Sequence, residues 1–453
     1  MSHYSTVNAI QAQRQTQEMP PIAHRPVRHP LIGRPILRYS AMRRRLFAGI
    51  GVNILLLGIV SLLTDLSSEM MVAILPMYIT TTLGGTAFAV GLAGGLGDSI
   101  SSMLKVFSGY WSDRTGRRKP FVFFGYGASA VAKLALAFSA TWGQVVGFRA
   151  VERTGKGMRD APRDAIIADS AAVEVRGKAF GIHQTMDTAG AIGGSLLALL
   201  LFWVFGLSYK TIILACAIVA FASLVPFLWV RDVRREPQKR SLGLNFRALP
   251  RRLKYFVAVA AVFALGNFTS WFFVLRAWDF FAETVSDDKA AAIAIGLYCV
   301  FNVVYSMFSI PVGILSDKIG RGRVLFLGYS LLGLTFLGFA FLHSVASYVG
   351  FFILYGLTYA LVKGAERAFV CDMCPDNIRG TALGTFYTAV GLVALPSGII
   401  AGLLWENVAS WAAFVYGGSL GLIAAALLLL GMRIWPKAGT PACTPEDVPL
   451  KTA

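Results

Sequence analysis

Long apolar segments follow one another along most of the chain, with short polar stretches between them. A hydrocarbon core about 30 Å thick requires roughly 20 residues of helix for each crossing. Segments of this length predict an all-α membrane protein with twelve transmembrane helices. They lie at residues 48–80, 86–111, 119–140, 142–165, 178–206, 209–230, 254–281, 291–315, 322–343, 347–371, 381–405 and 410–433.

A sequence repeat divides these segments into two groups of six. The motif that begins at Gly109 returns at Gly313, 204 residues later. Further pairs at offsets of 203 or 204 are Asp113 and Asp317, Arg117 and Arg321, Asp169 and Asp372, Arg176 and Arg379, and Gly181 and Gly384. A fixed offset near half the chain length indicates a duplicated unit. We therefore expect two six-helix repeats.

The polar stretches set the expected domain boundaries. The basic, Pro-containing first 45 residues are expected to be disordered, because such a composition buries little apolar surface. The expected parts are a cytoplasmic tail at 1–45, an N-terminal six-helix bundle at 46–230, a cytoplasmic linker at 231–253, a C-terminal six-helix bundle at 254–433 and a second cytoplasmic tail at 434–453.

The chain is basic, and its charge is sorted by loop. It has 453 residues, of which 56% are hydrophobic and 15% charged, with a net charge of +18 and a mean hydropathy of +0.62. Eight arginines precede residue 46 and nine Lys or Arg lie in 231–254, whereas the alternate loops hold little beyond Lys210 and Lys289. Because basic loops stay in the cytoplasm, we expect both termini on the cytoplasmic side of a bacterial inner membrane. The basic excess then reports topology rather than a nucleic-acid partner.

The two motif copies share the pattern Gly-x-x-x-Asp-x-x-Gly-Arg, and each follows an even-numbered helix. Together with the twelve segments and the repeat, this pattern resembles the major facilitator superfamily of secondary transporters, over about residues 46–433. The resemblance implies a cytoplasmic latch that holds the two halves in one conformation. Its residues would be Gly109, Asp113, Arg117, Gly313, Asp317 and Arg321.

Other stretches are similar to parts of the same family. The stretch from Arg153 to Gly157 is similar to its fourth-helix motif. The stretch from Gly190 to Gly194 matches the antiporter motif only in part, because the proline is absent, so import and export both stay open. Stretches around Asp65, Arg159 and Asn267 resemble a broad bacterial subgroup with no single assigned substrate.

Carboxylates inside the predicted spans are candidate coupling residues. A charge in a span costs at least about 2.5–3.5 kcal/mol on insertion scales, so each one is expected to have a partner or a function. Asp65 and Glu69 are four residues apart and share a helix face, where repulsion favours a proton on one of them. We expect this pair to couple transport to protons. Asp98 and its repeat equivalent Asn302 are expected on the same path.

Cationic side chains are equally concentrated. Arg149 and Arg153 on the fourth helix are candidates for the substrate path, although internal ion pairs that hold helices together would explain them equally well. Arg276 on the seventh helix is expected to compete with the proton for a carboxylate of the first-helix pair. Lys133, on a helix that does not line the cavity in this family, is expected to be structural or to extend toward the interface.

Metal binding is a weaker alternative. His183 and Asp187 lie one turn apart on the fifth helix, and with Asp65 and Glu69 they form a candidate set for a divalent ion. The lone pair Cys371 and Cys374 has the spacing of metal ligands, which is a weak signal.

The leading hypothesis is therefore a secondary transporter that moves a small solute by alternating access, coupled to protons and functional as a monomer. The solute would be an organic anion, a metabolite or a drug-like compound. A divalent metal ion such as iron is the alternative substrate, and a membrane-embedded enzyme or receptor is a remote one. No cofactor is expected, and the chain has no Gly-x-x-x-x-Gly-Lys-Ser/Thr loop for ATP.

The charge asymmetry generates a topology prediction. In a background in which the five native cysteines are replaced by serine, Lys239→Cys should resist a membrane-impermeant thiol reagent added to intact cells. Ser286→Cys in the same background should react. Labelling of position 239 from outside the cell would contradict the twelve-helix topology.

Overall fold

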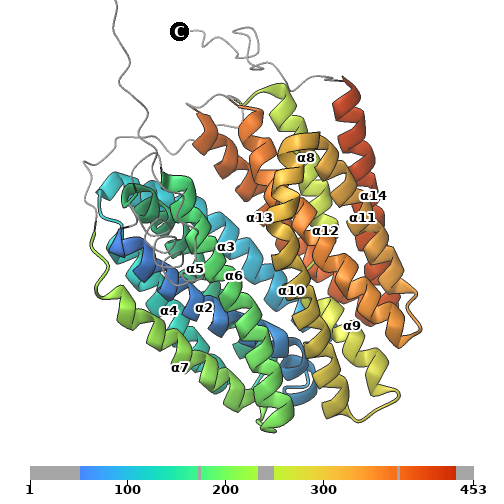
Figure 1. Cartoon of the computed structure of the whole chain (residues 1–453). Helices are drawn as coiled ribbons and strands as arrows, with labels where there is room; N and C mark the ends of the chain where they lie inside the picture. The colour runs from blue at the N-terminus through green and yellow to red at the C-terminus, as the bar shows by residue number, and fades with distance from the viewer. Residues whose placement is uncertain (1–50, 172–174, 233–248, 375–377, 435–453) are drawn as a thin grey trace, which may run out of the picture. The chain divides into compact units, whose positions relative to one another are not determined.

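The computed structural model describes residues 51–171, 175–232, 249–374 and 378–434, and almost all of them are helical (Figure 1). The predicted all-α fold is confirmed. The two predicted tails, apart from Ile434, and most of the predicted linker lie outside the described residues. In chain order the helices are α2 (Val52–Met77) with its continuation η1 (Tyr78–Thr82), α3 (Ala87–Thr115), α4 (Lys119–Ala137), α5 (Trp142–Asp169), α6 (Arg176–Leu199) with η3 (Leu200–Val204), α7 (Tyr209–Phe227), α8 (Arg251–Gly266), α9 (Trp271–Ala282), α10 (Asp287–Ile319), α11 (Arg321–Ala340), α12 (Val345–Asp372), α13 (Arg379–Asn407) and α14 (Ser410–Ile434).

Eleven helical segments of the described chain, with α8 and α9 taken as one, are long and apolar enough to cross a membrane. The twelfth predicted span is α5, which has 28 residues and a length of about 42 Å. It falls outside the eleven because charged side chains recur along it. α5 is long enough to span the membrane, and its many charged side chains are typical of a helix that packs among other helices.

The helix ends define two ends of the bundle. We call the end where α3 meets α4 and α10 meets α11 the motif end, which is uppermost in Figure 1. The opposite end, where α9 meets α10, is the far end. Several helices begin at the far end on capping hydroxyls, because a side-chain oxygen there satisfies a free backbone N–H. Thr141, Ser208 and Ser344 cap α5, α7 and α12 in this way.

The predicted helix at 254–281 is interrupted in the structure. α8 ends at Gly266 and α9 begins at Trp271, so the backbone between them is irregular. Such backbone is tolerated at membrane depth where protein buries it or a cavity adjoins it. The Tyr416 hydroxyl donates to the Leu265 carbonyl oxygen at 3.0 Å, which satisfies one acceptor released by the break. The interruption therefore turns part of a membrane helix into cavity lining.

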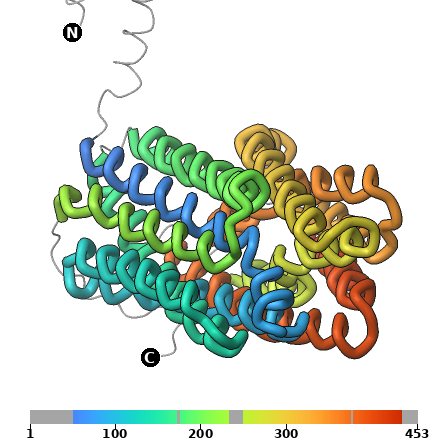
Figure 2. Tube along the Cα trace, turned by 90° about the horizontal axis from the view of Figure 1, so that it is seen from below, coloured from blue at the N-terminus to red at the C-terminus, as the bar shows by residue number. Residues whose placement is uncertain are grey.

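The described residues belong to one compact unit in which two sets of helices meet. In Figure 2, α4, α5 and α7 lie on one side and α11, α12 and α14 on the other. The closest contact between the sets joins α3 to α13. A Cβ atom on Gly91 would overlap the carbonyl oxygen of Gly398, and one on Gly398 would overlap that of Gly91. Small residues allow membrane helices to approach this closely.

This contact continues through the middle of the two helices. A Cβ atom on Gly402 would lie 2.7 Å from the Phe88 Cα, and one on Gly391 would lie 2.7 Å from the Ser102 Cβ. The packed stretch thus reaches from the far-end start of α3 to its middle. The structure is closed at the far end along this pair of helices.

A branched side chain at Gly398 should open that closure. In a background without native cysteines, Gly398→Val should increase several-fold the rate at which Val72→Cys reacts with an impermeant maleimide added at the far end. Gly127→Val is the matched control, because a Cβ there meets no atom within 4 Å. Equal labelling rates in the two folded variants would show that this contact does not hold the far end closed.

Candidate functional site: a charged central cavity

A cavity of about 350 Å³ lies among α2, α3, α5 and α6 of the first half and the α8–α9 break, α10 and α12 of the second. Its lining contains six of the residues predicted for coupling and substrate binding. These are Asp65, Glu69, Asp98, Arg153, Asp187 and Asn302. The fold therefore brings carboxylates of α2, α3 and α6 to one space. Arg149 and Arg276 are not part of this lining.

The lining extends from the middle of the bundle toward the motif end. Lys156 and Gln184 continue it on α5 and α6, and Ser306 and Lys363 continue it on α10 and α12. Each of these four residues lies nearer the motif end than the other cavity-lining residues of its own helix. Because the far end is packed shut, the cavity is directed toward the motif end.

Glu69 makes a hydrogen bond that joins the two halves. The Tyr298 hydroxyl on α10 donates to Glu69 Oε2 on α2 at 2.7 Å. Tyr298 was not among the residues that the sequence indicated. It lies one turn before Asn302 on the same helix, so the helical period from that predicted residue was the available signal. A carboxylate of the first half is thus held by a hydroxyl of the second.

Arg149 and Arg153 belong to a network on α5. Arg149 is 1% exposed, and its Nη1 lies 2.8 Å from Glu152 Oε2. Its guanidinium also lies 5.1 Å from the centre of the Trp271 ring at the start of α9. Arg153 lies 3.6 Å from the same Glu152 oxygen and 3.6 Å from Asp98 Oδ1. Arg149 therefore positions its neighbours, whereas Arg153 presents charge to the cavity.

His183 and Asp187 are adjacent, as their spacing predicted. His183 Nδ1 lies 3.6 Å from Asp187 Oδ2, and the imidazole is buried outside the cavity lining. Within the described residues, no group of three or more His, Cys, Asp or Glu side chains gathers closely enough to hold a metal ion. Cys374 is also buried, and its thiol donates to the Val370 carbonyl oxygen at 3.3 Å.

Two predicted cations lie away from the cavity. Arg276 was expected to face the carboxylates of α2, but its Nη1 donates to Ser410 Oγ at 2.9 Å, at the far-end start of α14. Lys133 is fully buried and donates to Ser67 and Ser68 on α2 at 2.8 and 2.9 Å. It does not extend to the interface, and its role as a structural link between α4 and α2 is the one the geometry supports.

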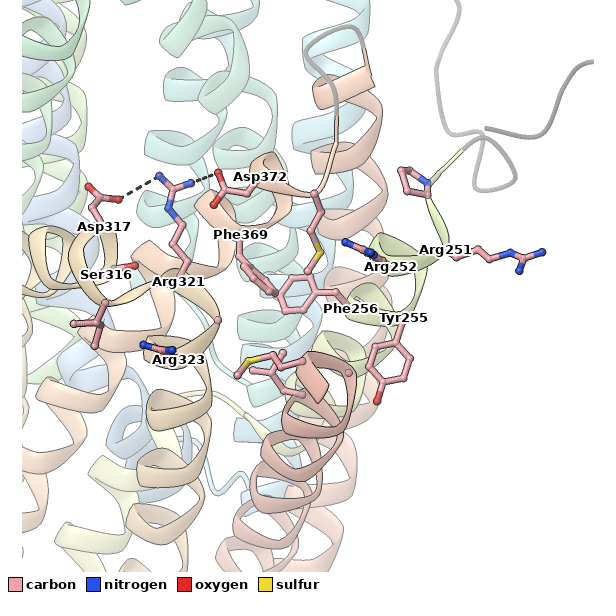
Figure 3. Close-up of a pocket in the computed structure, with 18 of the residues that line it drawn as sticks. Arg251, Arg252, Tyr255, Phe256, Ser316, Asp317, Arg321, Arg323, Phe369 and Asp372 are labelled. Carbon is pink, nitrogen blue, oxygen red and sulfur yellow. Dashed lines mark hydrogen bonds and ion pairs between the residues drawn. The ribbon is translucent and has the colours of Figure 1, made fainter. Parts of the chain in front are cut away.

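The two loop motifs have nearly the same geometry. In the second half, Arg321 lies 3.2 Å from Asp317 and 2.5 Å from Asp372, and its Nη1 donates to the Ala368 carbonyl oxygen at 3.0 Å (Figure 3). The guanidinium thus joins the end of α10 to the end of α12. Each terminal nitrogen of the guanidinium faces a different carboxylate, and these charge-assisted contacts fix its orientation.

In the first half the equivalent cation is Arg118, not the predicted Arg117. Arg118 pairs with Asp169, lies 3.1 Å from Asp113 and donates to the Ala165 carbonyl oxygen at 3.2 Å. Arg117 is exposed and makes none of these contacts. The correction follows from the offset, because Asp169 and Asp372 are 203 residues apart and Arg118 and Arg321 share that spacing. Matching the motif at 204 residues selected the wrong arginine.

Comparison with known protein families identifies the family of this chain. The chain matches the Major Facilitator Superfamily over residues 57–287 and 257–447. It belongs to the major facilitator superfamily. Members of this superfamily are secondary transporters rather than enzymes, and that is the class of this chain.

Individual relatives agree with this class. The chain is 45% identical over 381 residues to an uncharacterised MFS-type transporter of Methanocaldococcus jannaschii, covering 83% of this chain and 94% of the relative. That relative is archaeal, so the sequence group is not confined to bacteria. A shorter match of 31% over 137 residues, 30% of this chain and 26% of the relative, is to the methyl viologen resistance protein SmvA of Salmonella typhimurium. The crystal structure of the nucleoside transporter NupG matches with a TM-score of 0.71 and 14% identity, covering 84% of this chain and 99% of that one.

The corrected motif assignment can be tested by substitution. Arg118→Ala removes the contacts to two carboxylates and a carbonyl, so it should destabilise the purified protein by about 1–3 kcal/mol. Arg117→Ala should leave the thermal midpoint unchanged because the side chain is exposed. Thermal unfolding of both variants in one detergent measures the difference. A larger loss for Arg117→Ala would restore the original assignment.

Proposed function

We propose that this chain is a proton-coupled transporter of a small organic anion, with Glu69 as the coupling carboxylate. The observation that carries the proposal is the 2.7 Å hydrogen bond from Tyr298 to Glu69. Alternating access requires the two halves to move against each other about a central site. A titratable group bonded across the halves links its protonation to that movement.

The strength of the hydrogen bond between Tyr298 and Glu69 depends on the protonation of Glu69, which determines the conformation that each protonation state favours. A hydrogen bond to an ionised carboxylate is roughly twice as strong as one to a neutral group. Ionised Glu69 therefore favours the arrangement in which Tyr298 is close, which is the arrangement closed at the far end. A proton on Glu69 weakens the contact and favours separation of the halves there. Asp65 and Asp187 also line the cavity, so the proton has neighbouring carboxylates along its path.

Two lysines that form no ion pair support a small organic anion as the substrate. Lys156 and Lys363 line the cavity and form no ion pair within the described residues. Lys363 Nζ lies 4.9 Å from the centre of the Tyr359 ring, which holds the ammonium at the cavity wall. A cavity of about 350 Å³ is within the range of small-molecule sites. An organic anion would neutralise these lysines while its apolar part contacts the aromatic wall of the second half.

We also propose that the motif end faces the cytoplasm, so that both termini are cytoplasmic and the cavity is directed inward. Support comes from the basic residues at that end, among them Arg118, Arg251 and Arg323. In this orientation, in a cytoplasmic membrane, an inward-directed proton gradient would reach Glu69 from the far end. One chain contains both halves of the cavity, which supports action as a monomer.

Removing the charge at position 69 should separate coupling from exchange. In proteoliposomes, with a solute chosen by a thermal-shift screen of small carboxylic acids, Glu69→Gln should abolish accumulation driven by a pH gradient. Counterflow at equal pH should stay within about twofold of the unsubstituted protein, because the amide can still accept the Tyr298 bond. Tyr298→Phe should reduce the gradient response in part.

Tyr78→Phe is the matched control, since its hydroxyl donates to the Ser139 carbonyl oxygen at 3.1 Å within the first half. It should not alter the response to pH. Accumulation by Glu69→Gln equal to that of the unsubstituted protein would exclude Glu69 as the coupling site. If Asp65→Asn also leaves the response intact, Asp98 becomes the candidate.

A further inference from the structure

A second hollow, of about 960 Å³, opens at the motif end of the second half (Figure 3). It lies between the starts of α8 and α11 and the ends of α10, α12 and α14. It shares no lining residue with the central cavity. We propose that this hollow, hereafter the interface site, binds the phosphate headgroup of an anionic phospholipid.

The interface site carries excess positive charge. Five cations line it, Arg251, Arg252, Lys318, Arg321 and Arg323, against two carboxylates, Asp317 and Asp372. Both carboxylates are engaged by Arg321, as Figure 3 shows. Within the described part of the chain, the other four cations form no ion pair. Guanidinium groups match the geometry of phosphate oxygens, so a phosphate suits the arginines of this site.

The inner part of the same site is apolar. Phe256 and Phe369 pack edge to face with ring centres 4.9 Å apart, and both line the hollow with Leu428 and Met432. Ile319, which also lines the hollow, and Ile434 are 40% and 55% exposed at the ends of α10 and α14, as expected for side chains that face lipid. A cationic rim beside apolar side chains at the end of membrane helices matches the boundary between headgroups and acyl chains. A free phosphate ion would use the rim but not the apolar part.

At the corresponding place of the first half, a cation has partners within the described chain. There Lys119, at the start of α4, donates to the Leu228 carbonyl oxygen at 3.1 Å and lies 5.9 Å from the centre of the Phe227 ring. Its backbone N–H donates to Asp232 at 3.3 Å. The first half therefore engages its cation at this corner, whereas Arg323 of the second half forms no ion pair within the described residues.

Gly431 gives this corner of the second half a different wall. At an offset of 203 or 204 residues it corresponds to Leu228 or Phe227, which are bulky. A Cβ atom at Gly431 would overlap the ring of Tyr255. The glycine lets Tyr255 lie against α14, where its hydroxyl donates to the Leu427 carbonyl oxygen at 2.6 Å. The wall that Gly431 and Tyr255 form at the interface site is thus a specific departure from the repeat.

Occupation of the interface site would also affect the loop motif. Arg321 and Asp317 belong to both, so a phosphate near Arg321 would compete with the carboxylates that hold it. Anionic lipid would thereby be linked to the conformational equilibrium of the transporter.

Lipid retention by the purified full-length chain tests the proposal. The chain in detergent is titrated with dioleoylphosphatidylglycerol, with dioleoylphosphatidylcholine or with inorganic phosphate, and bound lipid is counted by native mass spectrometry alongside the thermal midpoint. Phosphatidylglycerol should be retained and should raise the midpoint, whereas phosphatidylcholine and phosphate should do neither. Arg252→Gln combined with Arg323→Gln should weaken phosphatidylglycerol binding about tenfold.

The matched control is Arg114→Gln combined with Arg117→Gln, which removes two arginines at the same end of the first half. It should bind phosphatidylglycerol like the unsubstituted chain. If the first pair of substitutions prevents folding, Arg251→Gln with Lys318→Gln, both exposed positions, should show the same loss. Equal retention by the interface-site and control variants would overturn the proposal. Equal retention of phosphatidylcholine, or equal stabilisation by inorganic phosphate, would overturn it as well.

Discussion

The pairing of charges on α5 is the constraint on which the rest of the structure depends. A buried charge costs several kcal/mol unless it is paired, and α5 is too polar to lie in lipid alone. Glu152 is 1% exposed because Arg149 and Arg153 neutralise it within the helix. Asp160, further along, is 3.0 Å from Lys105 of α3. These pairs fix α5 among its neighbours, and the place of Arg153 at the cavity follows from them.

The two halves contribute different chemistry to the cavity although they arose from one repeated unit. The first half supplies its four carboxylates, whereas the second supplies tyrosines, amides and Lys363. Asp98 and Asn302 show the difference at a single repeat position. The carboxylates of the cavity thus belong to one half, and the tyrosine hydroxyls that can bond to them belong to the other.

Much of this arrangement could be predicted from the sequence, because apolar length and the repeat offset determine where membrane helices occur. Facing positions on one helix, such as Asp65 and Glu69, were also accessible from the helical period. The remainder depends on how helices approach each other in three dimensions. The repeat gave no sign that Arg276 turns to Ser410, and motif matching alone selected Arg117 over Arg118. The interruption after Gly266 was hidden because its flanks are as apolar as an unbroken span.

On the proposal that Glu69 is the coupling group, the position of its hydrogen bond with Tyr298 would allow a single carboxylate to link protonation to movement. A bond within one half would change strength with pH and leave the two conformations equally populated. On this proposal, a bond between the halves would form in one conformation and be lost in the other, so protonation would change their ratio. Coupling energies of about 1–3 kcal/mol change such a ratio by about 5- to 150-fold. That range is large enough to direct transport and small enough that the transporter is not locked in either state.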